Sequence, residues 1–287
     1  MRALVTGGAG FIGTNLIKRL VADGHSVVSL DNYSTGKKEN EQEGCKYFWV
    51  DLVDTIDFSW FMKNIDVIFH LGALARIQPS LKKPVEYITN NFNGSLHVLE
   101  YARQKNIKVV YAGSSSKHDA LYVSPYAWSK YGGEELCKLY SEVYGLNTSI
   151  CRFYNVYGPH HLREGAYATV VGVFERQYME QDPLTITSDG EQRRDFTHVD
   201  DIVDGLVRCA DHDFKAEEFE LGRGLNYSIN EIAEMFGSDY PTKYIPKRLG
   251  ECHVTLFTDK KAHDILGWKP TRNIKDHIAE FIESCKK

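Results

Sequence analysis

The glycine-rich stretch TGGAGFIG, residues 6–13, constrains the fold of this chain more than any other segment. It joins an apolar run that predicts a buried strand (2–7) to a run in which apolar residues recur at helical spacing (11–24). Its glycines are spaced GxxGxxG: Gly7, Gly10 and Gly13. Glycine gives the turn its backbone freedom and lets a pyrophosphate approach the N–H groups at a helix N-terminus. The stretch therefore predicts a dinucleotide-binding strand–turn–helix unit.

Strand-like and helical runs alternate through the first half of the chain. The further strands are expected at 26–32, 46–52, 66–73, 109–115 and 148–158, with helices such as 87–104 and 125–146 between them. Such alternation predicts a doubly wound parallel sheet with helices on both faces. After about residue 158 the strand-like and helical runs alternate less regularly, which predicts a second, smaller α/β lobe. The expected division is 1–158 and about 190–212 for the dinucleotide domain, and about 159–189 and 213–287 for the lobe.

Composition narrows the partners of the 287-residue chain. The formal charge of −5 offers no general attraction for nucleic acid or an anionic membrane. The acidic run 211–220 is expected to be a solvated helix face or loop. Six scattered cysteines without a CxxC pair indicate free thiols. Because a strand is predicted from Arg2 onward, no signal peptide is expected, and we expect a cytoplasmic protein.

An aspartate at the end of the second predicted strand indicates the cofactor. Asp31 lies 18 residues after Gly13, where a carboxylate can accept both ribose hydroxyls of NAD and would repel the 2′-phosphate of NADP. An N-cap or turn aspartate is the alternative. Lys37 and Lys38 could soften the preference for NAD, and Asp51 is a candidate neighbour of the adenine.

Nine motifs in order resemble those of the extended short-chain dehydrogenase/reductases. They are TGGAGFIG, DNYSTG, DVIFHLGA, NNFNGS, SPYAWSK, RFYNVYGP, RRDFTHVDD and the late KRLGE with LGWKP. The resemblance covers essentially the whole chain and is strongest to the nucleotide-sugar epimerases and dehydratases, typified by UDP-glucose 4-epimerase. It implies a Rossmann-like domain that binds NAD and a C-terminal lobe that binds a nucleotide sugar, with no metal.

The resemblance also implies a set of cofactor-binding residues. These are Gly7, Gly10, Phe11, Ile12, Gly13, Asp31, Asn32, Ser34, Thr35, Gly36, Asp51, Leu52, Leu71, Gly72, Ala73, Ala75, Asn91, Tyr126, Lys130 and Tyr154.

The family's catalytic serine, tyrosine and lysine match Ser114, Tyr126 and Lys130. The YxxxK spacing places tyrosine and lysine on one helix face, although the same spacing also occurs in ordinary surface helices. A neighbouring ammonium would favour the phenolate of a tyrosine that acts as acid and base. Ser115 is one position away from the expected serine, and the choice between the two stays open. The implied reaction is a 4-epimerisation, in which C4 of the sugar is transiently oxidised and then reduced on its other face.

Two other functions compete with epimerisation. A 4,6-dehydratase, decarboxylase or reductase shares the scaffold, but the carboxylates that a dehydratase carries after the serine are replaced here by Ser115, Ser116, Lys117 and His118. This segment reaches Tyr126 after only 12 residues, so the loop is short and its polar residues are expected to be solvated or to reach the substrate. A non-catalytic NAD-binding module is the second rival.

The resemblance extends to the substrate lobe. It implies that Asn155, Arg194 and Arg248 contact the diphosphate, and Ser114 and Ser115 the sugar. Arg76 is expected to touch the sugar or diphosphate or to form a structural salt bridge, and Arg193 is expected in a surface ion pair. A small residue, Thr255, stands where a large one restricts the sugar in some relatives, so an N-acetyl sugar would fit.

Two further expectations concern partners and metals. The helices 87–104 and 125–144 resemble the family's dimer-forming pair, which implies a homodimer. His160, His161 and Glu164 suggest a metal by composition, but solvated side chains in a loop are the expected reading.

Overall fold

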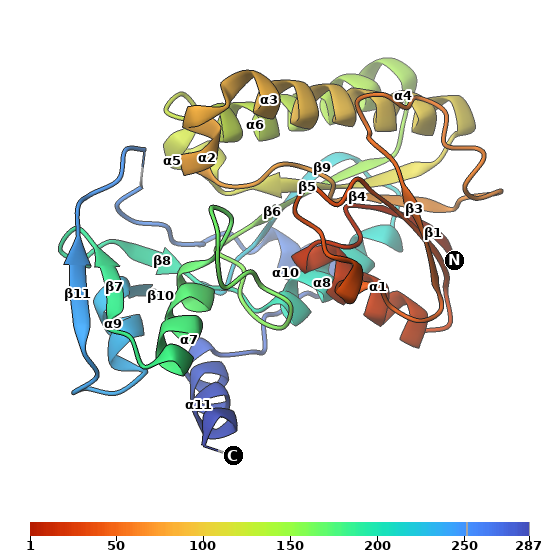
Figure 1. Cartoon of the computed structure of the whole chain (residues 1–287). Coiled ribbons are helices and arrows are strands. Elements are labelled where there is room, and N and C mark those ends of the chain that lie inside the picture. The colour runs from red at the N-terminus through yellow and green to blue at the C-terminus, as the bar shows by residue number, and fades with distance from the viewer. Residues whose placement is uncertain (251, 287) are drawn as a thin grey trace.

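The computed structural model describes residues 1–250 and 252–286. Its centre is a seven-stranded parallel sheet in the order β3-β2-β1-β4-β5-β6-β9 (Figure 1). The strands are β1 (Arg2–Thr6), β2 (Ser26–Asp31), β3 (Cys45–Trp49), β4 (Val67–His70), β5 (Lys108–Ser114), β6 (Thr148–Phe153) and β9 (Lys215–Leu221). The chain order reverses between β1 and β4, which is where an open α/β sheet places its ligand. The predicted doubly wound fold is confirmed.

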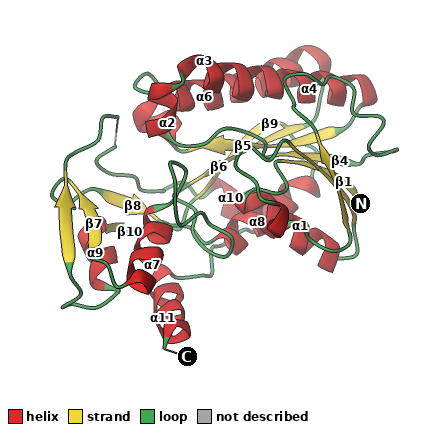
Figure 2. Ribbon diagram, in the orientation of Figure 1, coloured by secondary structure: helices red, strands yellow, loops and turns green. Residues whose placement is uncertain are grey.

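Helices cover both faces of this sheet, as Figure 2 shows. One face carries α1 (Phe11–Ala22), α8 (Val199–Ala210) and α10 (Lys261–Leu266), whose apolar side chains join a core with β1, β4 and β6. The other carries α3 (Pro84–Ile88), α4 (Gly94–Lys105) and α6 (Pro125–Tyr144), with a π-helical turn at Thr89–Asn93 between α3 and α4. Because both faces are covered, the central strands are almost entirely buried.

The second lobe has its own core and two small sheets. It contains α7 (Val170–Glu180), β7 (Leu184–Thr187), β8 (Arg193–Asp195), β10 (Asn226–Ser228), α9 (Ile229–Glu234), β11 (Thr242–Ile245) and α11 (Ile274–Cys285). β8 pairs antiparallel with β10, and β7 pairs parallel with β11. The lobe lies beside the carboxyl end of the large sheet, at the left of Figure 1.

The observed division of the chain differs from the expected one at two places. β9 pairs with β6 as an edge strand of the large sheet, so this part of the acidic run is neither a helix nor a loop and does not belong to the lobe. β8, expected in the dinucleotide domain, pairs instead with β10 of the lobe. The segment 190–212 is thus split between the lobe and α8, which packs on α1.

Short helices form part of the connections between strands. α2 (Ile77–Lys82) follows β4, α5 (Ser116–Ala120) follows β5, and a 3-10 turn spans Lys38–Asn40. Within residues 1–250 and 252–286, no helix is both long enough and apolar enough to cross a membrane.

Candidate active site

A cavity of about 570 Å³ lies between the carboxyl ends of the large sheet and the second lobe. Its lining comes from the glycine turn, the ends of β2 to β6, the segment 162–170, and β7, β8, Arg248, Cys252 and Thr255 of the lobe. Both lobes therefore contribute to one site, as an enzyme that holds a cofactor beside a substrate requires.

The glycine turn is shaped for the close approach of a phosphate. Gly7 has a φ of +72°, and a Cβ on Gly13 would lie 2.2 Å from the carbonyl oxygen of Gly7, so neither position accepts a larger residue without rearrangement. Gly10 is the N-cap of α1 and offers no capping side chain. The first N–H groups of α1 thus remain available to a pyrophosphate at the cavity wall.

Two carboxylates, of Asp31 and Asp51, line the cavity near the glycine turn. Asp31 accepts the backbone N–H of Ala9 at 2.9 Å and that of Tyr33 at 2.7 Å, which fixes both of its oxygens. Burial raises the pKa of Asp31, and these two hydrogen bonds act in the opposite direction. Each oxygen keeps a second lone pair for a ribose hydroxyl. Asp51 accepts the amide N–H of Asn32 at 3.1 Å, so it lies beside Asp31 at the cavity wall.

The serine and tyrosine predicted to be catalytic meet at the carboxyl end of β5. The Tyr126 hydroxyl donates to Ser114 Oγ at 3.4 Å, and Ser114 Oγ lies 2.8 Å from Ser116 Oγ. Tyr126 is held by the start of α6, where Ser124 caps the helix by accepting the N–H of Ala127. Ser115 also lines the cavity, but the hydrogen bond from the Tyr126 hydroxyl is accepted by Ser114.

Lys130 lies one helical turn beyond Tyr126 and is buried. Its ammonium is 4.4 Å from the centroid of the Tyr111 ring, and the Tyr111 hydroxyl donates to the carbonyl of Lys130 at 3.0 Å. Burial lowers the pKa of Lys130 to about 8, and the charge of Glu134 acts in the opposite direction. The lysine lies behind the cavity lining.

Most of the expected cofactor residues line the cavity. The exceptions are Gly36, Asn91, Lys130 and Tyr154. Gly36 packs against Ala9 of the glycine turn, and Tyr154 packs against Phe257. Asn91 was expected to touch the cofactor, but both its amide hydrogens are engaged behind the lining, by the Leu74 carbonyl and by Ser129 Oγ. It braces the turn after β4 instead.

All the expected substrate-binding residues line the same cavity: Arg76, Ser114, Ser115, Asn155, Arg194 and Arg248. The Asn155 amide donates to the Asp195 carbonyl at 3.0 Å and to Thr255 Oγ1 at 3.2 Å, which ties the end of β6 to the lobe. Arg193 forms the expected ion pair, 2.8 Å from Glu231.

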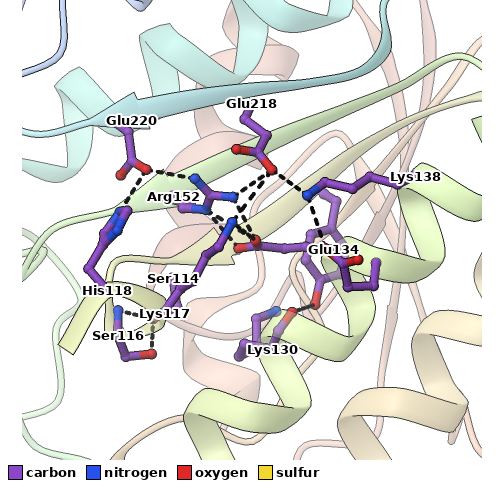
Figure 3. Close-up of polar contacts among 12 residues, drawn as sticks. Ser114, Ser116, Lys117, His118, Lys130, Glu134, Lys138, Arg152, Glu218 and Glu220 are labelled. Carbon is purple, nitrogen blue, oxygen red and sulfur yellow. Dashed lines mark hydrogen bonds and ion pairs between the residues drawn. The ribbon is translucent and has the colours of Figure 1, made fainter. Parts of the chain in front are cut away.

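Lys117 and His118 lie on α5 and are not among the residues that line the cavity; Figure 3 shows their polar contacts. α5 directs both side chains toward acidic residues of α6 and β9. His118 Nε2 is 2.9 Å from Glu220, and this hydrogen bond raises the pKa of His118. Lys117 Nζ lies 3.7 Å from Glu134 and 3.6 Å from Glu218. Both side chains thus have acidic partners distant in sequence, while 46% of the His118 side chain remains exposed to solvent as expected.

Arg152 of β6 lies at the centre of this network (Figure 3). Its guanidinium approaches Glu134 at 2.8 Å, Glu218 at 2.8 Å and Glu220 at 2.7 Å. Glu134 is completely buried, and only 4% of the Arg152 side chain is exposed. Although burial acts to raise it, hydrogen bonds from Lys138 and Arg152 lower the pKa of Glu218 to about 2. The network anchors α5, which begins two residues after Ser114.

A second buried network corrects the expectation of solvation for His161, whereas His160 and Glu164 are exposed as expected. His161 is buried, with its Nε2 2.8 Å from Glu175, and His277 of α11 lies 2.9 Å from the same carboxylate. Burial acts to raise the pKa of Glu175, but the bonds from both histidines lower it to about 2. Sequence reasoning also missed Tyr87 and Tyr167 near the cavity, because no motif includes either residue.

A glycine turn at a helix N-terminus, an aspartate at the end of β2 and a serine–tyrosine pair at the same sheet edge define a dinucleotide-dependent enzyme of the short-chain dehydrogenase/reductase type. The sequence profile of the NAD dependent epimerase/dehydratase family matches residues 3–222, and the chain belongs to this family. NAD is accordingly its cofactor.

Individual relatives match along their whole length. The UDP-glucose 4-epimerase of Mycolicibacterium smegmatis is 33% identical, over 99% of this chain and 98% of its own. The crystal structure of the UDP-glucose 4-epimerase of Thermotoga maritima with UDP-glucose has a TM-score of 0.92 at 28% identity, covering 100% of this chain and 99% of that one. The UDP-glucuronic acid 4-epimerase of Bacillus cereus, in complex with UDP-glucuronic acid and NAD, has a TM-score of 0.90 at 28% identity, with coverage of 100% and 99%.

Proposed function

We propose that the protein is an NAD-dependent 4-epimerase of a nucleotide sugar, a UDP-hexose or a UDP-N-acetylhexosamine, acting through a transient 4-keto sugar. The observation that carries the proposal is the hydrogen bond between Tyr126 and Ser114 in a cavity that both lobes line. The similarity to UDP-sugar 4-epimerases supports the same reaction.

The reaction assigns a separate role to each residue of the set. Tyr126 accepts the proton of the sugar 4-hydroxyl and later returns it, and Ser114 hydrogen-bonds the same oxygen. Lys130 supplies positive charge one turn behind the tyrosine, which favours the phenolate. NAD, when bound, supplies the hydride acceptor and donor. The glycine turn and Asp31 would hold it.

The second lobe would hold the rest of the substrate. Arg194 and Arg248 line the cavity from that lobe, and guanidinium groups suit a diphosphate because they pair its oxygens bidentately. Asn155 lines the same cavity. Thr255, hydrogen-bonded to the Asn155 amide, is small enough to leave room for an acetamido group.

The acids around the cavity favour epimerisation over dehydration. Among the described residues, Asp31 and Asp51 are the acids that line it, and both lie where the cofactor ribose is expected. A dehydratase needs carboxyl groups near the sugar, because a base must remove the C5 proton and an acid must protonate the departing C6 hydroxyl. The segment after Ser114 supplies no such group, because Lys117 and His118 face the Arg152 network.

A conservative substitution tests the proposal. Tyr126→Phe should abolish epimerisation of a panel of UDP-, dTDP-, GDP- and ADP-sugars followed by NMR, while NAD still binds. Tyr122→Phe is the matched control, because Tyr122 is 87% exposed and lies four residues earlier. Unchanged turnover in the Tyr126 variant would refute the mechanism. A wild-type protein that binds NAD but converts no sugar would indicate a non-catalytic module.

We also propose a homodimer formed by α3, α4 and α6. These helices pack side by side on one face of the sheet. They expose large apolar side chains: Val85, Ile88, Trp128, Leu139, Val143 and Tyr144. Exposed apolar side chains gathered on adjacent helices are typical of an interface. Sedimentation equilibrium should give twice the chain mass, and a charge introduced by Val143→Glu should give the monomer mass.

A further inference from the structure

One arginine enters the cavity from a strained backbone. Arg76, the N-cap of α2, has a φ of +80°, a region that costs a non-glycine residue about 1–3 kcal/mol. The turn that precedes it is braced on both sides. Asn91 accepts the N–H of Leu74 at 2.8 Å and donates to its carbonyl at 3.0 Å, and the Tyr87 hydroxyl donates to the carbonyl of Ala75 at 2.5 Å. Strain maintained by such bracing is a feature of functional positions.

The guanidinium of Arg76 is oriented but not neutralised. Its Nε donates to the Tyr167 carbonyl at 3.1 Å, which fixes the plane of the group. Within residues 1–250 and 252–286 it forms no ion pair, and its two terminal nitrogens make no protein hydrogen bond. The side chain of Arg76 is half-buried where it lines the cavity, and burial lowers its pKa. An unpaired cation that lines a cavity is stabilised when a bound ligand supplies an anion.

The position of Arg76 indicates which part of a ligand supplies that anion. The Tyr87 ring, whose hydroxyl binds the carbonyl beside Arg76, meets the Tyr126 ring edge-on at 6.5 Å. The charges of Tyr126 and Tyr87 both act on Arg76. Arg76 therefore lies beside the proposed acid/base, at the sugar. The cavity arginines of the second lobe, Arg194 and Arg248, are the residues proposed for the diphosphate.

We propose that Arg76 binds an acidic group on the sugar, so that the substrate is a nucleotide-linked uronic acid. This inference rests on the proposed function, because it takes the reacting C4 to lie at Tyr126. The carboxylate of a uronic acid is two bonds from C4, on the carbon attached to C5, and its two oxygens match two N–H groups of a guanidinium. A neutral hexose would leave this cation unpaired.

Paired substrates and paired variants test the proposal on the full-length protein. UDP-glucuronate and UDP-glucose differ only at C6, as a carboxylate or a hydroxymethyl group. We expect kcat/KM of the wild type to favour UDP-glucuronate by on the order of 100-fold. Arg76→Gln should reduce this preference to less than about 10-fold, mainly through loss on the acidic sugar. Arg248→Gln, the control, should weaken both substrates by a similar factor because both carry the diphosphate.

Three outcomes would overturn the assignment of Arg76. The first is a wild type that prefers UDP-glucose. The second is an Arg76→Gln variant that loses equally on both sugars, which would make Arg76 a diphosphate, NAD or structural residue. The third is a shifted pH profile with the preference intact, which would make it a tuning residue for Tyr126.

Calorimetric binding of the two sugars separates this inference from the proposed function. If UDP-glucuronate binds more tightly in an Arg76-dependent way but yields no 4-epimer, the epimerase proposal fails and the Arg76 assignment stands. If UDP-glucose is epimerised and UDP-glucuronate is neither bound nor converted, the epimerase proposal stands and the Arg76 assignment fails. If neither sugar nucleotide binds, both proposals fail.

Discussion

Removing the charge of Arg152 should destabilise the protein more than removing any surface arginine. The guanidinium neutralises three carboxylates, of which Glu134 is completely buried and Glu220 is only 10% exposed. In Arg152→Met these charges remain in a poorly solvated place without their main partner. Removing one member of a buried ion pair costs about 3–5 kcal/mol. At roughly 2–4 °C per kcal/mol for a chain of this size, Tm should fall by about 6–20 °C.

Calorimetry and urea unfolding at pH 7 measure this loss. Arg2→Met is the matched control, because Arg2 pairs with Asp66 at 3.0 Å but both side chains are nearly half exposed. It should cost less than about 1 kcal/mol. Adding Glu134→Gln to Arg152→Met should recover part of the loss, because it removes one uncompensated buried charge. A change below about 1 kcal/mol for Arg152→Met would refute the reasoning that the network is buried and coupled.

Three other predictions concern single groups. The activity should decline as pH rises through about 8, where Lys130 loses the proton that its buried amine holds less tightly than in water; a pH–rate profile flat from 7 to 10 would contradict this. Burial lowers the pKa of His70 to about 3. Between pH 3 and 6.5 the unfolded chain therefore binds more protons than the folded one, and the free energy of unfolding decreases as pH falls through that window. From pH 7 to pH 5 the expected decrease is about 2 kcal/mol. Urea midpoints at the two pH values measure it, and the same difference in His70→Gln would contradict the assignment. Asp31→Asn should weaken NAD binding by about 10- to 100-fold in a calorimetric titration, and unchanged affinity would exclude a ribose contact.

The large sheet was predictable because its signals are local. Each buried parallel strand reads as an apolar run, and the helices that cover it show helical spacing. The glycine turn and Asp31 were predictable for the same reason, since strand, turn and helix are contiguous. Their meeting at one sheet edge follows from the parallel topology alone.

The features that sequence reasoning missed depend on partners far along the chain. β9 reads as a polar segment because three of its seven residues are glutamates, yet Glu218 and Glu220 are neutralised by Arg152 of the neighbouring strand. The sequence around Lys117 and His118 likewise predicts a loop, and only the folded structure shows that both contact glutamates of β9. No local pattern reveals a charge that is compensated across a sheet.

The same limit applies to the second lobe. His161 finds its partner Glu175 on α7 and a second histidine, His277, 116 positions later on α11. The segments between them pack by tertiary contacts rather than by strong periodicity, so the boundary of the lobe was misplaced at β8 and β9. Gly7, Asp31 and Ser114 stand at or just beyond the ends of strands, and all three line the cavity.

The fate of the hydrogen at C4 tests the central claim most directly. The protein would be incubated in ordinary water with UDP-glucuronate and UDP-glucose, each carrying deuterium at C4, and the products followed by NMR and mass spectrometry. The account predicts a C4-inverted sugar that retains the deuterium, because Tyr126 moves only the hydroxyl proton and the hydride returns within the same site. Loss of deuterium to water, a stable 4-keto-6-deoxy product or the absence of an inverted sugar would contradict it.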